Sequence, residues 1–180
     1  MLILLAFAPF IVFAIINRFA GSLAGLLAGA ATALLLLVRD WLIKKHPPKI
    51  LDIGTTVLFS GLSLYFLAAK PAWSVISVRL CVDSGLLLIV LISLAIGEPF
   101  TLQYAREQVP QEFWESPEFR KTNYVISSVW ALAFGVMILA EVAILFSSQV
   151  PRRLGVIVII LALLGAVKFT GWYPERVRKA

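Results

Sequence analysis

The chain has 180 residues, of which 61% are hydrophobic and only 14% are charged. A soluble domain carries about 25% charged residues, so this composition excludes an ordinary soluble protein. The net charge is +6, but the basic residues stand between long apolar runs, where they set orientation and contact anionic lipids, so we expect no nucleic-acid partner. The single cysteine, Cys81, excludes an internal disulfide, and the single histidine, His46, is expected to be a solvated loop residue rather than a metal ligand.

Six apolar runs follow one another along the chain. A bilayer core of about 30 Å requires about 20 mainly apolar residues in a helix, and the runs approach or reach this length. The sequence therefore predicts an all-α polytopic transmembrane helical bundle of about six spans, in one integral membrane domain that covers residues 1–180. The predicted spans are residues 2–16, 19–38, 50–68, 74–96, 123–146 and 154–172.

The first run, "MLILLAFAPFIVFAII", is similar to the apolar part of a signal peptide. It lacks a basic region in front of the apolar residues, and further spans follow directly, so we expect a first helix that is retained. This span is short, and its turn into the second span is tight. An alternative count of five spans, in which the first two segments form a re-entrant or tilted pair, stays open.

The second span carries Gly21, Gly25 and Gly29 at intervals of four residues. Small residues at this spacing let another helix approach closely. The partner is either a helix of the same chain or a second protomer, which leaves a homo-oligomer open. Pro47 and Pro48 follow the span and prevent its helix from continuing.

The only long polar segment lies between the fourth and fifth spans and reads "GEPFTLQYAREQVPQEFWESPEFRKT". It mixes five glutamates and three basic residues with five aromatic residues. This mixture predicts short helices in the headgroup region, with aromatic side chains inward and charges outward. Ser116 as N-cap, Pro117 in the first turn and Glu118 near the positive helix end predict that the fifth helix begins before Asn123.

The distribution of Lys and Arg predicts the orientation in the membrane. With the N-terminus inside, eleven basic residues lie on the inner side and five on the outer side, which favours a cytoplasmic location for both termini. The inner set is Arg39, Lys44, Lys45, Lys49, Arg106, Arg120, Lys121, Lys168, Arg176, Arg178 and Lys179, and the outer set is Arg18, Lys70, Arg79, Arg152 and Arg153.

Three charged residues lie deep inside the fourth and fifth predicted spans. At a rise of about 1.5 Å per residue, Arg79 and Glu141 both lie roughly 8 Å below the outer surface, and Asp83 lies roughly 14 Å deep. Arg79 and Asp83 are four residues apart and therefore share one helix face. Charges at such depths are costly unless they are paired or face water, so the three residues form either a clamp between helices or a polar pathway.

A second polar layer is expected on the inner side of the membrane. It pairs Asp52, at the start of the third span, with Lys168, near the end of the sixth. Like the outer layer, it would fix the relative positions of the helices that carry it.

The sequence contains no motif for catalysis. It has no phosphate-binding loop, no cluster of metal ligands, and no serine or cysteine nucleophile with a histidine at a membrane face. We therefore expect no catalytic residues, no metal and no cofactor. An intramembrane enzyme that uses only carboxylates is the remaining enzymatic alternative.

Three stretches resemble one known family. They are "FAPFIVFAIINRF", the glycine-containing "LFSGLSLYF", and the segment from Glu98 to Phe134, in which a proline and an interfacial stretch precede a span that opens with Asn and Trp. In these stretches the chain is similar to the intracellular septation protein A-like inner-membrane proteins. The resemblance implies a bacterial inner-membrane protein that acts through membrane partners in envelope synthesis or division, and it carries no catalytic residues with it.

These observations lead to two functional hypotheses. The first is a non-enzymatic inner-membrane protein that acts through contacts with other membrane proteins. The alternative is a small transporter or channel with an intramembrane polar site at Arg79, Asp83 and Glu141. A water-accessible cavity that reaches Asp83 would favour the second hypothesis, whereas a dry contact between Arg79 and Glu141 would favour the first.

Overall fold

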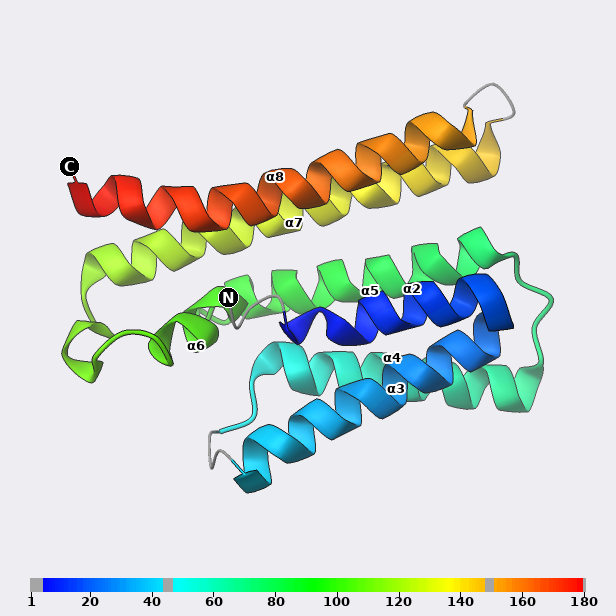
Figure 1. Ribbon diagram of the computed structural model, residues 1–180, viewed down its shortest axis with the longest axis horizontal. Coiled ribbons are helices and arrows are strands. Elements are labelled where there is room, and N and C mark those ends of the chain that lie inside the picture. The colour runs from blue at the N-terminus through cyan, green and yellow to red at the C-terminus, as the bar shows by residue number, and fades with distance from the viewer. Residues whose placement is uncertain (1–4, 44–46, 148–150, 180) are drawn as a thin grey trace. The chain divides into compact units, whose positions relative to one another are not determined.

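The computed structural model describes residues 5–43, 47–147 and 151–179, and every regular element within these ranges is a helix (Figure 1). This confirms the predicted all-α fold. Lys44, Lys45 and His46, predicted to lie in a basic loop, are outside the described residues. The helices are α2 (Ala8–Ala20), α3 (Ser22–Val38), the π-helical turn η1 (Arg39–Ile43), α4 (Ile50–Ala69), α5 (Val75–Ala95), α6 (Phe100–Arg106), the 3-10 turn η2 (Gln111–Phe113), α7 (Pro117–Phe146) and α8 (Arg152–Lys179).

The chain divides into two compact units, Met1–Ile89 and Val90–Ala180. The first unit contains α2, α3, η1, α4 and most of α5, and the second contains the end of α5 and all later helices. The boundary falls inside one continuous helix, α5, rather than in a linker. The single membrane domain expected from the sequence therefore stays a prediction, and each unit is considered separately below.

Five of the described helices are long and apolar enough to cross a membrane, which makes the chain a polytopic membrane protein. They are Ser22–Leu42, Ile50–Ala69, Val75–Ala95, Pro117–Phe146 and Arg152–Arg178. The remaining apolar helix, α2, has 13 residues. Pro9 stands in its first turn, where the fixed φ of proline favours a helix start, and residues 2–4 of the predicted span lie outside the described residues. Thus α2 is the segment on which the predicted counts of five and six spans differ.

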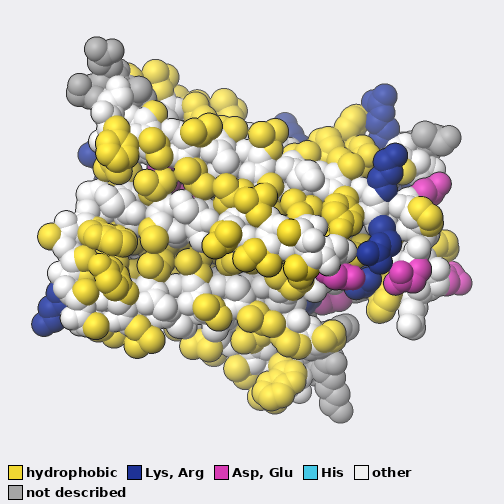
Figure 2. Space-filling model, turned by 180° about the vertical axis from the view of Figure 1, so that it is seen from behind, with side chains coloured by type: hydrophobic (Ala, Val, Ile, Leu, Met, Phe, Trp, Pro, Cys, Tyr) yellow, Lys and Arg dark blue, Asp and Glu magenta, His cyan; other side chains and the backbone are white. Residues whose placement is uncertain are grey.

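On the face that Figure 2 shows, apolar side chains cover most of the surface, whereas Lys, Arg, Asp and Glu gather mainly near its ends. Leu35, Val57 and Leu139 are each at least 67% exposed in the middle of a span. Such surfaces suit contact with lipid tails, which is the environment that the composition predicts. Trp41 and Trp172, exposed by 64% and 51%, stand near helix ends, where tryptophan favours the membrane–water interface.

Close helix packing in the first unit depends on the glycines of α3. Gly21 has a φ of +88° and separates α2 from α3, which lets the chain reverse direction within one residue. A Cβ atom at Gly25 would lie 2.8 Å from the Cβ of Asn17 on α2, and one at Gly29 would lie 2.8 Å from the ring of Phe59 on α4. Gly25 and Gly29 thus let two helices of the same chain approach α3, while Gly21 belongs to the turn.

The core of this unit is aromatic and aliphatic. Phe59 is fully buried, and its ring centroid lies 5.1 Å from that of Phe10 and 5.5 Å from that of Phe13. Both distances suit tilted aromatic pairs. Around these rings the buried cluster comprises Phe13, Leu26, Ala30, Phe59, Phe66, Val78 and Val82 from α2, α3, α4 and α5.

In the second unit, α7 and α8 pack side by side (Figure 1). The indole Nε1 of Trp130 donates a hydrogen bond of 2.9 Å to Thr170 Oγ1, which itself donates to the carbonyl of Ala166. The predicted start of α7 is confirmed, because Ser116 Oγ accepts a hydrogen bond of 3.2 Å from the backbone N–H of Phe119. This is the N-cap bond of a helix that begins well before its apolar part.

The polar segment between α5 and α7 is folded onto α7. Its helix α6 follows Pro99, which offers no capping side chain, so the first amides of the helix take acceptors from elsewhere. The N–H of Phe100 donates to Ser93 Oγ at 3.1 Å, and the N–H of Thr101 donates to Ser127 Oγ at 3.4 Å. The prediction of short helices with inward aromatic residues is correct for Phe100 and wrong for Phe113, whose side chain is 50% exposed.

Substituting Gly29 tests the close approach of α3 and α4. The Gly29→Ala variant places a methyl group against the buried ring of Phe59, and overpacking of this kind costs about 1–3 kcal/mol. Gly61→Ala on α4 is the matched control, because nothing lies within 4 Å of its Cβ position. It should be neutral or stabilise the protein by up to about 1 kcal/mol through helix propensity. Reversible unfolding followed by circular dichroism measures both, and equal effects would contradict the packing described here.

Candidate functional site

The intramembrane charges of the first unit lie on α5. The buried stripe of this helix runs through Val78, Val82 and Leu86, which are at most 3% exposed. Arg79 and Asp83 each follow a residue of this stripe, so they lie along its edge, on one face, and are partly exposed. At about 1.5 Å per residue, Asp83 lies roughly 12 Å from the start of α5, which is well inside the bilayer.

Glu141 is the most deeply buried ionisable side chain among the predicted site residues. It lies on α7, five residues before the helix ends at Phe146, and is only 2% exposed. It continues the buried stripe of α7 through Trp130, Phe134 and Met137. Enclosing a carboxyl group within a membrane span is costly, and carboxyl groups in such positions are candidates for function.

The predicted polar site combines residues of both units. Arg79 and Asp83 belong to the first unit and Glu141 to the second, so the expected contact of Arg79 with Glu141 stays a prediction. The same holds for the expected pair of Asp52, in the first unit, and Lys168, an exposed residue of the second.

A buried ion cluster joins the end of α3 to the start of α4. The ammonium group of Lys49 donates to Asp40 Oδ2 at 3.0 Å and lies 3.9 Å from Asp52 Oδ2. Arg39 pairs with the other oxygen of Asp40 at 2.6 Å. Lys49 and Asp40 are only 4% and 6% exposed. The cluster therefore ties the two helices together where the chain leaves the membrane, and gives Asp52 a partner within its own unit.

Sequence reasoning treated Arg39 and Lys49 as orientation signals and missed this cluster. The available signal was the spacing of Lys49 and Asp52, three residues apart on the first turn of a helix, which favours an ion pair. The contribution of Asp40 could not be read in the same way, because it depends on the turn that brings the two helix ends together.

Three uncharged polar side chains lie in the core of the first unit. Asn17, Thr55 and Ser63 are at most 4% exposed. Asn17 Oδ1, Thr55 Oγ1 and Ser63 Oγ have no hydrogen-bond partner among the described residues. Thr55 and Ser63 stand one turn before and one turn after Phe59 on α4, so polar atoms lie on both sides of the aromatic core.

Hydroxyl groups also connect the polar segment to α7. Thr101 Oγ1 donates to the carbonyl of Asn123 at 2.9 Å and shares a hydrogen bond of 2.8 Å with Ser127 Oγ. All three residues are at most 4% exposed. Because these bonds are shielded from water, they hold α6 in one position on α7.

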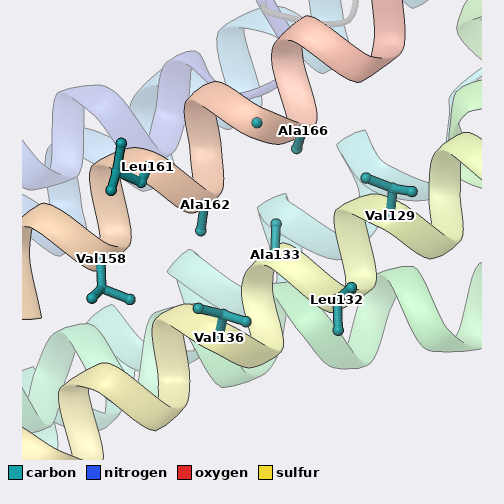
Figure 3. A pocket seen from close by; sticks show the side chains of 9 residues that line it. Val129, Leu132, Ala133, Val136, Val158, Leu161, Ala162 and Ala166 are labelled. Carbon is teal, nitrogen blue, oxygen red and sulfur yellow. The ribbon is translucent and has the colours of Figure 1, made fainter. Parts of the chain in front are cut away.

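A groove of about 430 Å³ runs between α7 and α8 and is lined by apolar residues only. Ala133 on α7 and Ala162 on α8 face the gap between the helices, while Leu132 and Leu161, 69% and 62% exposed, stand at its edges (Figure 3). In a bilayer, lipid tails fill a groove of this kind, and it contains no group for chemistry. Within the described ranges, no three His, Cys, Asp or Glu side chains are placed to hold a metal ion.

Removing the lysine of the ion cluster tests its contribution to stability. In Lys49→Met, Asp40 loses a buried cationic partner while it stays buried itself, and breaking a buried ion pair costs roughly 3 kcal/mol. Lys70→Met is the matched control, since Lys70 is exposed at the end of α4 and the same charge is removed. Unfolding in detergent should show a large loss for the first variant and little change for the second. A loss that is equal in both would contradict the structural role of Lys49.

No protein-family model, no curated protein and no solved structure matches the chain. Its function is therefore inferred from its own residues and from the charges and surfaces described above.

Proposed function

We propose that the chain is a non-enzymatic inner-membrane protein that acts through contacts with other membrane proteins. In this proposal the contacts are made by its polar cap, defined as residues 97–121. Both termini and the polar cap lie in the cytoplasm, as the distribution of basic residues predicts. The observation that carries the proposal is that the polar cap is folded. A segment that only connected α5 to α7 would not need an ordered structure.

The length and order of the polar cap support a role beyond connection. Helices of a bundle are joined by about 2–8 residues, whereas residues 96–116 separate α5 from α7. Ordering a residue costs about 1–2 kcal/mol in backbone entropy, so an ordered connection of this length needs compensating contacts. The bonds of Phe100 and Thr101 to Ser93 and Ser127 provide part of that compensation.

The exposed surface of the polar cap indicates the kind of partner. Residues 107–118 contain four glutamates and no Lys or Arg, although the chain as a whole carries a charge of +6. Glu112, Phe113 and Glu118 are exposed. Cytoplasmic loops of membrane proteins are rich in Lys and Arg, so an acidic surface with an exposed aromatic ring is complementary to them. The resemblance to septation proteins supports a setting in envelope synthesis or division.

A photo-reactive phenylalanine analogue at position 113 tests this proposal in living cells. We expect crosslinking to a specific membrane protein with basic cytoplasmic loops, and a severalfold lower yield in the Glu112→Lys variant because like charges repel. The same analogue at position 146 is the control, since Phe146 is 79% exposed at the other end of α7. Equal products at both positions, or none at 113, would contradict a partner at the polar cap, and products with a second copy alone would identify a homo-oligomer.

A second candidate function is transport through the membrane, and the deep burial of Glu141 favours it. Carboxyl groups inside spans often mark ion or proton paths. The polar atoms of Asn17, Thr55 and Ser63 add further polar groups to the core of the first unit. In this candidate, Asp83, near the middle of α5, is the residue whose charge the pathway requires.

Neutralising Asp83 distinguishes transport from a clamp. For a transporter, Asp83→Asn abolishes proton or ion flux into proteoliposomes and leaves unfolding unchanged. For a clamp, no flux exceeds that of empty liposomes, and the variant loses about 1–3 kcal/mol of stability because a polar contact inside the span is broken. Glu118→Gln, which neutralises an exposed carboxylate outside the spans, is the control and should leave flux unchanged.

A further inference from the structure

Two arginines of the polar cap converge on one carboxylate. Arg120 Nη1 donates to Glu115 Oε2 at 3.3 Å, and Arg106 Nη2 lies 3.8 Å from Glu115 Oε1. Thus one anionic group, with two oxygen atoms, is shared by two guanidinium groups that come from different helices, α6 and α7.

The arginines are held in place independently of this carboxylate. Arg106 Nη1 donates to Glu98 at 3.1 Å, and the guanidinium lies 5.6 Å from the ring centroid of Trp114. Arg120 Nη2 donates to the carbonyl of Gly97 at 3.3 Å. Both guanidinium groups would therefore keep their positions if Glu115 moved away.

Glu115 is the exchangeable member of the group. Its side chain is 78% exposed, whereas those of Arg106 and Arg120 are 23% and 36% exposed. Ion pairs that are open to solvent contribute little to stability, so a competing anion can replace the carboxylate at low cost. In addition, Arg106 Nε is a buried donor without a hydrogen-bond partner among the described residues.

Arg120 lies close to the ends of two spans, and Arg106 shares its carboxylate partner. Arg120 precedes the apolar part of α7, which begins near Val125, by about 8 Å at the helical rise per residue. Gly97, which Arg120 contacts, follows the end of the span α5 by two residues. This is the headgroup layer that borders the hydrocarbon core. Lys121, exposed beside Arg120, adds a further positive charge.

We propose that Arg106 and Arg120 form a binding site for the phosphate group of an anionic lipid, and that Glu115 is the internal anion that this phosphate displaces. The forked guanidinium group matches phosphate oxygens with two parallel hydrogen bonds, and two such groups can share one phosphate. Free inorganic phosphate carries the same chemistry, but only a lipid holds its phosphate at this depth. The inference does not rest on the proposed protein partner.

Lipid titration of the full chain in detergent tests the site, with binding followed by native mass spectrometry or calorimetry. The probes are short-chain phosphatidylglycerol, short-chain phosphatidylcholine and inorganic phosphate. We expect the wild-type chain to bind phosphatidylglycerol more tightly than either other probe. Glu115→Gln should tighten this binding about fivefold, because one charged residue near an anionic lipid corresponds to about 1 kcal/mol.

Glu112→Gln is the matched control for Glu115→Gln, since it removes the same charge from an exposed residue that pairs with neither arginine. Arg120→Gln should weaken the binding of phosphatidylglycerol about fivefold, because it removes one charge worth about 1 kcal/mol. Its control, Lys121→Gln, should weaken this binding less. If Arg120→Gln does not fold by circular dichroism, Arg120→Lys replaces it and should still weaken binding, because an ammonium group lacks the guanidinium fork.

Two results would overturn the proposal. Equal tightening by Glu115→Gln and Glu112→Gln would mean that only the overall charge matters, and unchanged binding in a folded Arg120 variant would exclude the site. If inorganic phosphate binds as tightly as phosphatidylglycerol, the arginines recognise free phosphate and the assignment to a lipid is wrong.

Discussion

Lipid tails offer no hydrogen bonds, so every polar atom within a span needs a partner inside the protein. Several hydroxyl groups of the described helices meet the requirement within their own helix. Thr32, Thr56, Ser128 and Thr170 each donate to the carbonyl four residues earlier. Charged groups meet the same requirement by pairing at helix ends. Asp40 and Lys49, for example, form an ion pair between the end of α3 and the start of α4. Glu141, a carboxyl group that is 2% exposed within a span, is therefore the side chain whose enclosure is most costly in a bilayer.

The polar cap follows a different rule from the spans. Its contacts are a mixture of shielded hydroxyl bonds, which position α6, and exposed ion pairs, which water weakens. The shielded set around Thr101 fixes the scaffold, and the exposed set around Glu115 lies on top of it. A rigid base under an exchangeable charged surface is suited to recognition, whether the ligand is a protein loop or a lipid headgroup. The proposed protein contact is centred on Glu112 and Phe113, whereas the proposed lipid site is formed by Arg106 and Arg120, so either can exist without the other.

Much of the fold could be predicted from the sequence, because long apolar runs and the N-cap of a helix depend only on residues that are neighbours in the chain. The start of α7 at Ser116 is such a case, since all its determinants lie within four positions. Contacts between residues far apart in the chain could not be predicted. The capping of α6 by Ser127 spans 26 residues, and the pairing of Asp40 with Lys49 depends on the shape of the turn between them. Phe113 was misjudged because composition alone does not distinguish an inward from an outward ring.

The hydrogen bond between Trp130 and Thr170 has a consequence for how α7 and α8 are aligned. Elsewhere the facing surfaces of these helices are apolar and include Ala133, Ala162 and Ala166, which line the groove between them, and apolar surfaces of this kind tolerate sliding by one turn. In lipid, no hydrophobic force opposes such a slide. The indole N–H of Trp130 reaches the Thr170 hydroxyl at only one axial offset between the helices. This single hydrogen bond therefore sets the register of the α7–α8 pair.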